Sequence, residues 1–315
     1  MNSDPSLANA PEWAAAALLK RFLRAVAPPA PAFLATLAGA WLLGASSLQA
    51  AEWQLVWADE FDKAGAPDTN KWACEEGFVR NGEAQFYTRA RSENARVENG
   101  TLVIEARQEK FPNPRYRPGS AGGRANAREF AEYTSASLTT RGLAAWRYGR
   151  IEVRAKIPGG RGMWPAIWML GQGRSAGWPA CGEIDIMEFV GFQPDTIHGT
   201  VHTGKYNHVK KTEKGATVQV KAPYESFHVY AIEWDAEKID FLVDDQKYFS
   251  FANEHSGVEA WPFDQPHYLI LNTAVGGAWG GQKGIDPSIF PTRFEIDYVR
   301  VYQRPAAAAT GAPVR

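Results

Sequence analysis

The hexapeptide Glu183-Ile-Asp-Ile-Met-Glu188 threads three acidic side chains through apolar ones. On a helix, at about 100° per residue, the acids would point in three directions, and neither an acidic nor an apolar face would form. On a strand, Glu183 and Asp185 share one face and the two isoleucines share the other. Glu188 would point to the apolar side unless a β-bulge near Met187 adds one residue and turns it back. The spacing therefore predicts a bulged strand whose three acids line one surface.

Three tryptophans stand close to these acids in the sequence, at Trp164, Trp168 and Trp178. No lysine or arginine interrupts the hexapeptide. An acidic strand facing solvent is the ordinary alternative, and a site for a hard cation, which takes several carboxylate oxygens, is a second one. The aromatic neighbours favour a third interpretation, because flat indole faces suit the apolar faces of sugar rings. The sequence thus favours carboxylates that act on a carbohydrate.

The composition of the 315-residue chain indicates one globular all-β domain, with 45% hydrophobic residues, 12% aromatic residues and 29 glycines. Short alternating or β-branched runs recur after residue 50, for example at 101–106, 151–157 and 294–302, and Gly, Pro and Asn separate them. About 250 residues is a normal size for one such sandwich. The formal net charge of −1 offers no basic surface for phosphate backbones. We therefore expect no nucleic-acid partner, and a neutral polymer fits better.

The first fifty residues have a different character. Basic residues precede an apolar stretch over 32–45, and small residues follow it up to Ala50. This order predicts a signal peptide over residues 1–50. An uncleaved anchor is the alternative, although the apolar stretch is shorter than the about 20 residues of a membrane span. Export would place the protein in the periplasm or outside the cell, with residues 51–304 as the folded domain and residues 305–315 as a disordered tail.

Two cysteines, Cys74 and Cys181, would meet an oxidising compartment after export. A disulfide between them is then allowed, and two free thiols are equally consistent with the sequence. Cys181 lies two residues before Glu183, so the strand period would turn it toward the acid-bearing face. The sequence leaves the choice between a bridge and free thiols open.

The segment Gly162-Met-Trp-Pro-Ala-Ile-Trp-Met-Leu-Gly171, followed by Trp178-Pro-Ala-Cys-Gly and the hexapeptide, closely resembles bacterial laminarinases. These are endo-1,3-β-glucanases of glycoside hydrolase family sixteen. Further similar stretches extend the resemblance over about residues 53–303: Trp57–Asp62, Asn99–Ala106, Tyr148–Lys156, Leu271–Gly277 and Asp297–Tyr302. The resemblance implies a concanavalin-like β-jelly-roll sandwich of two antiparallel sheets, with a polysaccharide bound across the concave sheet.

The resemblance also implies the roles of the three acids. Glu183 corresponds to the nucleophile of a retaining glycosidase and Glu188 to its acid/base, and Asp185 lies between them as a residue that orients and tunes the nucleophile. Such enzymes hold their two carboxyl groups about 5–5.5 Å apart. Like-charge repulsion from Glu183 and Asp185 would raise the pKa of Glu188 and keep it protonated. No catalytic cofactor is implied.

Seven further residues match positions that contact sugar in the family, each with a simpler alternative. Glu152 and Arg154 could instead form an ion-pair ladder on the surface, and one of Trp164 and Trp168 could belong to the core. A tight turn is the alternative for Asn81, a buried core histidine for His202, and a loop aromatic that covers the core for Trp279. The implied substrate-binding set is Asn81, Glu152, Arg154, Trp164, Trp168, His202 and Trp279.

Some relatives bind a structural calcium on the convex side. The matching residues here are Glu60, Gly100 and Asp297. Oxygen ligands of this kind suit Ca²⁺, but a sequence does not show whether they converge. The resemblance therefore leaves a structural calcium as one of two alternatives. A monomer is expected.

Residues 110–128 depart from the family pattern. They form a long, basic stretch rich in Pro and Gly, of a length typical of functional or disordered loops. We expect this loop to cover one end of the cleft and to influence which glucan chains enter.

Three functions agree with these observations. An exported endo-1,3-β-glucanase is the first, and the bulged six-residue motif favours it over the five-residue form of lichenases. The same mechanism on mixed-linkage glucan or agarose, or glycosyl transfer in place of hydrolysis, is the second. A glucan-binding lectin without activity is the third, and the presence of both Glu183 and Glu188 argues against it.

Overall fold

The computed structural model describes residues 52–119, 124–172 and 177–305. Within these ranges the chain forms two β-sheets, a short helix α2 (Arg124–Ala127) and a 3-10 turn η1 (Pro287–Ile289). The predicted all-β sandwich is confirmed. The predicted export segment and residues 306–315 of the tail lie outside the described residues, so the boundaries at 51 and 304 stay predictions. None of the described helices is long and apolar enough to cross a membrane.

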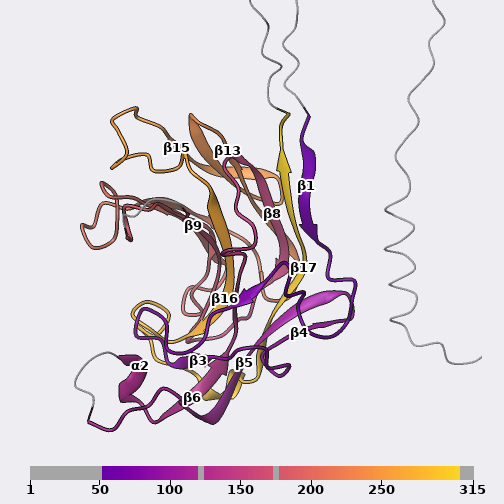
Figure 1. Cartoon of the computed structure of the whole chain (residues 1–315), viewed down its shortest axis with the longest axis vertical. Coiled ribbons are helices and arrows are strands. Elements are labelled where there is room, and N and C mark those ends of the chain that lie inside the picture. The colour runs from indigo at the N-terminus through magenta and orange to yellow at the C-terminus, as the bar shows by residue number, and fades with distance from the viewer. Residues whose placement is uncertain (1–51, 120–123, 173–176, 306–315) are drawn as a thin grey trace, which may run out of the picture. The chain divides into compact units, whose positions relative to one another are not determined.

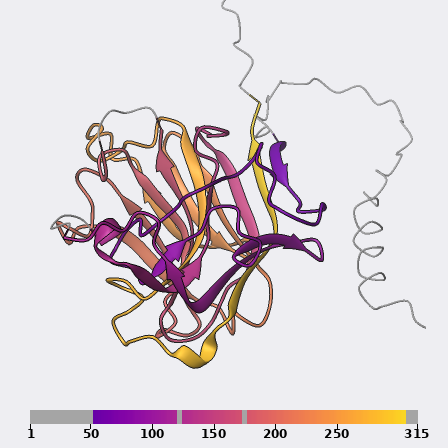
Figure 2. The ribbon, with the colours of Figure 1, turned by 60° about the horizontal axis from the view of Figure 1, so that its bottom comes forward.

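The larger sheet contains ten of the described strands, and its strand order mixes the two ends of the chain. Figure 1 shows β13, β8, β17 and β1 side by side, and Figure 2 shows β1 in indigo still beside β17 in yellow. In spatial order the strands are β15 (Gln246–Ala252), β14 (Lys238–Val243), β13 (His228–Trp234), β8 (Gly149–Lys156), β17 (Thr292–Gln303), β5 (Thr101–Pro112), β6 (Phe130–Ser135) and β3 (Gln85–Tyr87), while β1 (Gln54–Asp59) pairs with β17 and β4 (Ala95–Glu98) pairs with β5.

The smaller sheet contains seven of the described strands and carries the acids of the hexapeptide. Its order is β12 (Lys214–Gln219), β11 (Thr196–His202), β10 (Glu183–Glu188), β9 (Met163–Gly171), β16 (His267–Val275), β7 (Ser137–Thr139) and β2 (Ala73–Cys74). All pairings in both sheets are antiparallel except the parallel pair of β3 and β6. The hexapeptide thus lies near the middle of a sheet, with hydrogen-bonded neighbours on both sides.

The core lies between the two sheets. Ile151 and Val153 of the ten-stranded sheet are fully buried in one apolar cluster with Ile167, Ile184 and Leu271 of the seven-stranded sheet. Burying one such side chain stabilises the fold by about 1.5–3 kcal/mol. Because side chains alternate along a strand, this cluster decides which residues of β8 and β10 point away from the core.

Strand β10 is bulged where the sequence predicts. Asp185 pairs with Trp168 of β9, whereas Met187 already pairs with the next residue, Ile167, so β10 carries one extra residue. The pairing with β11 shifts at the same place, between Asp185 and Glu188. Met187 enters the core, and Glu188 returns to the side of the other acids.

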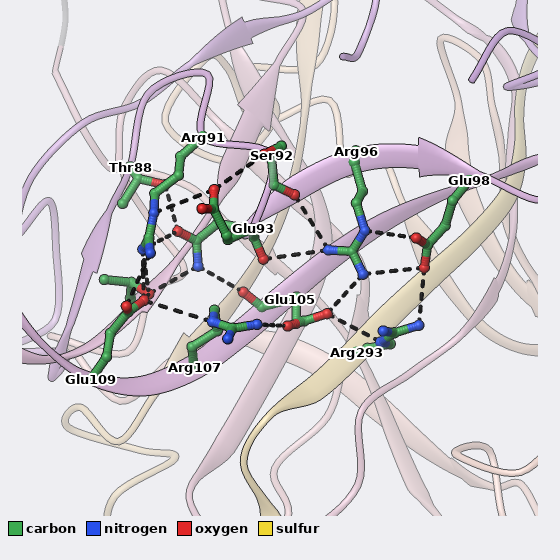
Figure 3. Close-up of polar contacts among 12 residues, drawn as sticks. Thr88, Arg91, Ser92, Glu93, Arg96, Glu98, Glu105, Arg107, Glu109 and Arg293 are labelled. Atoms are coloured by element: carbon green, nitrogen blue, oxygen red, sulfur yellow. Dashed lines mark hydrogen bonds and ion pairs between the residues drawn. The ribbon is translucent and has the colours of Figure 1, made fainter. Parts of the chain in front are cut away.

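An ion-pair cluster lies on the outer face of the ten-stranded sheet, around the buried Glu105 of β5 (Figure 3). The Glu105 side chain is only 3% exposed and forms ion pairs with Arg96 at 2.9 Å and with Arg293 at 3.1 Å, and Arg107 also pairs with it. Arg293 lies directly opposite Glu105 in the ladder between β17 and β5. Arg96 and Arg293 also share Glu98, at 2.8 and 3.0 Å. The cluster therefore ties β4, β5 and β17 together.

We expect Glu105→Gln to lower the free energy of unfolding by about 2–3 kcal/mol, because three guanidinium groups would lose the one carboxylate that they share. Urea unfolding of the two proteins would measure the difference. Glu93→Gln is the matched control, since the Glu93 side chain is 51% exposed, and it should change the free energy of unfolding much less than Glu105→Gln does. Equal effects of the two substitutions would contradict a stabilising role of the cluster.

Both cysteines are free. Cys74 lies in β2, and Cys181 lies just before β10; β9, β16 and β7 stand between these two strands. Neighbouring strands are about 4.8 Å apart, so the separation far exceeds the about 7 Å limit for a disulfide between Cα atoms. The sheet order thus excludes the bridge that the sequence had left open.

Candidate active site

The three acids of β10 lie together on the face of the seven-stranded sheet that points away from the core. Glu183 and Asp185 are joined by a hydrogen bond between their side chains. Glu188 lies near enough for the charge of Glu183 to raise its pKa. Asp185 is only 2% exposed. Three acids that are buried so close together cost stability, which indicates a functional site.

Burial is the largest cause of the raised pKa of all three carboxyl groups. It raises the pKa of Glu183 and of Glu188 from 4.5 to about 7. The pKa of Asp185 rises well above its usual range. Burial is the largest cause, and the charges of both glutamates add to it. Repulsion on Glu188, which the sequence suggested as the cause, is thus secondary to burial. The hydrogen bond between the two side chains raises the pKa of Asp185 and lowers that of Glu183, so Asp185 is the donor and Glu183 the acceptor.

The two glutamates differ in what stabilises their ionised forms. The Trp178 indole N–H donates to Glu183 Oε2 at 2.7 Å, and the positive charge of Arg80 and the Asp185 hydrogen bond act in the same direction. Glu188 accepts from the Trp164 indole at 3.0 Å, and the charge of Glu183 opposes its ionisation. Glu183 is therefore the first to ionise, and Glu188 keeps its proton longer. Their roles as nucleophile and acid/base stay predictions, which are developed below.

His202 of β11 reaches the acids, as the resemblance implies. Its Nε2 lies 3.4 Å from Asp185 Oδ2 and 3.9 Å from Glu183 Oε1. Burial lowers the pKa of His202 to about 4, and the neighbouring His208 adds to the effect. The imidazole is thus neutral at pH 7 and gives the acids no compensating charge.

The two predicted tryptophans of β9 share the acid-bearing face. Trp164 donates to Glu188, and Trp168, opposite Asp185 in the ladder, donates to Asn272 Oδ1 at 2.7 Å. Trp168 is buried, but in a small cluster on this face and outside the main core. Both tryptophans therefore stand beside the acids, and their contact with sugar stays a prediction.

Trp279 and Asn81 lie at the edge of the same site. The Trp279 ring meets Trp164 edge to face, with ring centroids 5.5 Å apart. Asn81 adopts a positive φ of 53°, and its carbonyl accepts from the Ala278 N–H at 2.9 Å, next to Trp279. The Asn81 amide donates to Glu83 at 3.3 Å. Asn81 thus serves the turn that the sequence offered as its alternative, and any sugar contact stays a prediction.

The structure contradicts the placement of Glu152 and Arg154 beside the acids. Both belong to β8 of the ten-stranded sheet and alternate with core residues, so they point outward from the opposite sheet. Glu152 accepts from Arg150 at 2.9 Å, and Arg154 donates to Asp297 at 2.7 Å. They form the ion-pair ladder that the sequence offered as the alternative. The strand period gives their shared face correctly, but it does not assign the strand to a sheet.

The three candidate calcium ligands lie at or near the ten-stranded sheet, and their carboxylates are bonded to arginines. Glu60 binds Arg300 through both oxygens, at 2.7 and 3.0 Å, and Asp297 binds Arg154. Gly100, with φ of 72°, occupies the turn between β4 and β5. Because the carboxylates of Glu60 and Asp297 pair with arginines, they do not form a calcium site together. A calcium held through other oxygens stays a prediction.

The described part of the 110–128 loop packs beside the segment that carries Asn81. Arg128 donates to the Glu83 carbonyl at 3.2 Å and lies over the Phe78 ring at 4.7 Å. Arg115 reaches Glu76 at 3.5 Å. Residues 120–123 lie outside the described ranges, and the expected covering of the cleft stays a prediction.

Two residues of the site escaped the sequence-based set. Trp178, noted there only as a neighbour of the acids, donates to Glu183, and Arg80 lies over the Trp168 ring at 4.9 Å. Trp178 precedes Glu183 by five residues, close enough for a tight turn to bring it back. No comparable signal marks Arg80, because about 100 residues separate it from the acids and only the sheet brings them together.

Comparison with known proteins identifies the family. Residues 82–300 match the description of glycosyl hydrolases family 16. The chain belongs to glycosyl hydrolase family 16. It is 50% identical to a β-glucanase of Rhodothermus marinus over 296 residues, which cover 90% of this chain and 96% of that one. The chain is therefore a glycoside hydrolase.

Two solved structures of the family are similar throughout the described domain. The X-ray structure of the laminarinase from Rhodothermus marinus has a TM-score of 0.73 at 50% identity, and the match covers 81% of this chain and 99% of that one. The second is a non-specific endo-β-1,3(4)-glucanase that was crystallised with 1,3-β-D-cellotriosyl-glucose. It has a TM-score of 0.73 at 48% identity and covers 80% of this chain and 95% of that one.

Membership of family 16 bears on the metal alternative. The ligand atoms of Glu183, Asp185 and His202 lie within 4.8 Å of one another, so by spacing alone they could hold an ion. Family 16 hydrolases need no catalytic cofactor. The hydrogen bond between Glu183 and a protonated Asp185 gives these residues a role without a metal.

We expect Glu188→Gln to stabilise the fold at pH 8 and to leave its stability unchanged at pH 4. The folded pKa of about 7 exceeds the unfolded value of 4.5, so the stability from Glu188 is complete below pH 4.5 and is lost as the pH rises through 7. Glutamine does not ionise, and at pH 8 it should therefore gain about 1–2 kcal/mol.

Urea unfolding at the two pH values measures this difference, with exposed Glu225→Gln as the control that should show none. Destabilisation by Glu188→Gln at pH 8 would show that the fold favours the ionised carboxylate.

Proposed function

We propose that this chain is an endo-acting 1,3-β-glucanase that hydrolyses internal bonds of laminarin-like glucans with retention of configuration. One observation carries the proposal: the bulge in β10 places Glu183 and Glu188 on one face, and each accepts a hydrogen bond from a different tryptophan. The 50% identity to the laminarinase supports the choice of substrate.

In the first step, Glu183 attacks the anomeric carbon and Glu188 gives its proton to the departing glycosidic oxygen. A glycosyl ester forms on Glu183, and the C–O bond to the leaving chain breaks. The unequal surroundings of the two carboxyl groups prepare this division, because Glu183 ionises more readily. Burial keeps the proton on Glu188 to near pH 7, where it is useful as an acid.

In the second step, Glu188 takes a proton from water, and the water oxygen attacks the anomeric carbon and releases Glu183. Asp185 supports both steps. Asp185 donates a hydrogen bond to Glu183, which spreads the negative charge of the free carboxylate. The same hydrogen bond adjusts to the loss of that charge when the ester forms on Glu183. A protonated Asp185 also spares the site a second buried negative charge beside Glu183.

The rings around the acids suit a neutral sugar chain. Trp164 and Trp279, which are partly exposed, offer apolar surface, and the neutral His202 adds a polar group without charge. A β-1,3(4) specificity, which includes mixed-linkage glucan, is the second candidate, because the relative crystallised with a 1,3-linked glucosyl oligosaccharide is described as non-specific.

We expect the chain without residues 1–50 to release oligosaccharides from laminarin, and Glu183→Gln to lower kcat by at least about 10³-fold. Reducing-sugar assays and product sizing on laminarin, mixed-linkage glucan and agarose measure this.

Glu183→Ala should recover activity with azide and give an α-glycosyl azide, because azide would enter where the nucleophile is missing. A β-azide, or rescue at Glu188 with the α-product, would overturn the roles of the two glutamates. Glucan binding without products would indicate a lectin.

We further propose that the protein is exported, that residues 1–50 are removed, and that it acts as a monomer. The apolar stretch at 32–45 and the preceding basic residues support export. N-terminal sequencing of the mature protein from cell fractions, with its mass from light scattering, tests these points. A cytoplasmic protein that retains residue 1 would refute export.

A structural calcium near Glu60, Gly100 and Asp297 is the last proposal. It rests on the resemblance, while the ion pairs of Glu60 and Asp297 with arginines weigh against side-chain coordination. Thermal unfolding with calcium and with a chelator decides it. A melting temperature that does not respond to either would refute the site.

A further inference from the structure

The Trp178 side chain combines two properties that seldom occur together. Its N–H donates to Glu183 Oε2 at 2.7 Å, yet the residue is 40% exposed. An indole exposed to this degree usually gives its N–H to water. The polar edge of Trp178 is instead directed to the carboxylate of the proposed nucleophile.

Histidines on two other segments hold the Trp178 ring. His208 stacks against it with centroids 4.9 Å apart and an angle of 34°, and His202 meets it at 6.0 Å. His208 and His202 also contact each other edge to face at 5.2 Å. The three rings are thus in mutual contact beside Glu183.

The position of His208 is itself fixed by its neighbour in the sequence. Asn207 is 1% exposed, and its amide donates to the Thr203 carbonyl at 3.0 Å. Its side-chain oxygen accepts from the Lys210 N–H at 3.1 Å, and its own N–H donates to Thr212 at 3.2 Å. The loop after β11 is thus closed on itself and holds His208 against Trp178.

A second tryptophan stands beside the other glutamate in a similar way. Trp164 donates to Glu188 at 3.0 Å, Trp279 meets Trp164 at 5.5 Å, and His198 meets Trp279 at 4.9 Å. Each catalytic candidate therefore has its own indole donor, supported by further rings. Indole N–H is a donor only, so it favours the ionised form of the carboxylate that it contacts.

We propose that Trp178 is a positioning residue that holds the ionised carboxylate of Glu183 in place, and that His208 fixes the Trp178 ring. The inference rests on the proposed nucleophilic role of Glu183. It makes the loop 203–213, which carries neither of the two proposed catalytic glutamates, part of the support of the nucleophile. Other ionisable groups that face Glu183 are Arg80, Cys181, Asp185, Glu188 and His202.

The test is the titration of Glu183 and Glu188 by carboxyl-carbon NMR in the substrate-free enzyme, beside the pH profile of kcat/KM on laminarin. We expect Trp178→Phe to raise the pKa of Glu183 by about 1, since a net hydrogen bond to a charged group is lost, and to move the acidic limb to higher pH. Trp164→Phe is the matched control, and it should raise the pKa of Glu188 and move the alkaline limb.

Two milder variants separate positioning from folding. His208→Ala should move the acidic limb in the same direction as Trp178→Phe but by less, while Val209→Ala, at an adjacent residue that is 72% exposed, should leave both limbs unchanged. If Trp178→Phe shows no cooperative unfolding transition, that variant is not folded, and the titration of His208→Ala then decides the proposal.

A uniform loss of kcat/KM in Trp178→Phe, with the pKa of Glu183 unchanged, would overturn the inference and leave Trp178 as a surface for sugar. A shift confined to Glu188 would overturn it as well. If the wild-type enzyme does not cleave laminarin, the proposed substrate fails, and the NMR titration still decides whether Trp178 holds Glu183.

Discussion

The one-residue bulge in β10 is the constraint on which the site depends. Without it, Glu188 would point into an apolar core, where an acid lacks partners, and Met187 would point outward. With it, one strand satisfies two demands at once: its apolar residues fill the space between the sheets and its three acids share the opposite face. The bulge lies between well-paired strands on both sides, so the register of β9 and β11 holds the acids where they are.

The same arrangement places buried acids where the fold gains nothing from them. Burial raises the pKa of Glu183 and Glu188 to about 7, and this rise reflects the free energy that ionisation of these carboxyl groups costs the folded state. The Trp178 indole, the hydrogen bond from Asp185 and the charge of Arg80 each lower the pKa of Glu183 and offset part of this rise. Stability is recovered elsewhere, in the interior packing and in the arginine cluster around Glu105 on the other sheet. The seven-stranded sheet therefore carries the reactive acids, and the ten-stranded sheet carries the ion pairs that stabilise the fold.

The two faces also show why charged residues of similar appearance have different roles. On the ten-stranded sheet, Glu105 pairs with arginines of β4, β5 and β17 and Glu152 pairs with Arg150 of its own strand, and such ion pairs stabilise without reacting. Glu183 and Glu188 have tryptophan donors in place of a paired guanidinium. A hydrogen bond from a neutral donor leaves the carboxylate able to attack or to exchange a proton, which a tight ion pair would hinder.

The sequence by itself determined the features that depend on neighbours along the chain. The alternation and odd spacing of residues 183–188 required a strand with a bulge, and the motif pointed to family 16 and its acids. Only the tertiary structure decided the features that depend on strand order. Glu152 and Arg154 share a strand face as expected, but β8 belongs to the opposite sheet, because its partners are β13 and β17. In the same way Cys74 and Cys181 are kept apart by intervening strands, while Arg80 and His202 are brought to Glu183, and His208 to Trp178, from other segments. Local periodicity says which way a side chain points from its strand, whereas the pairing of strands says what it meets there.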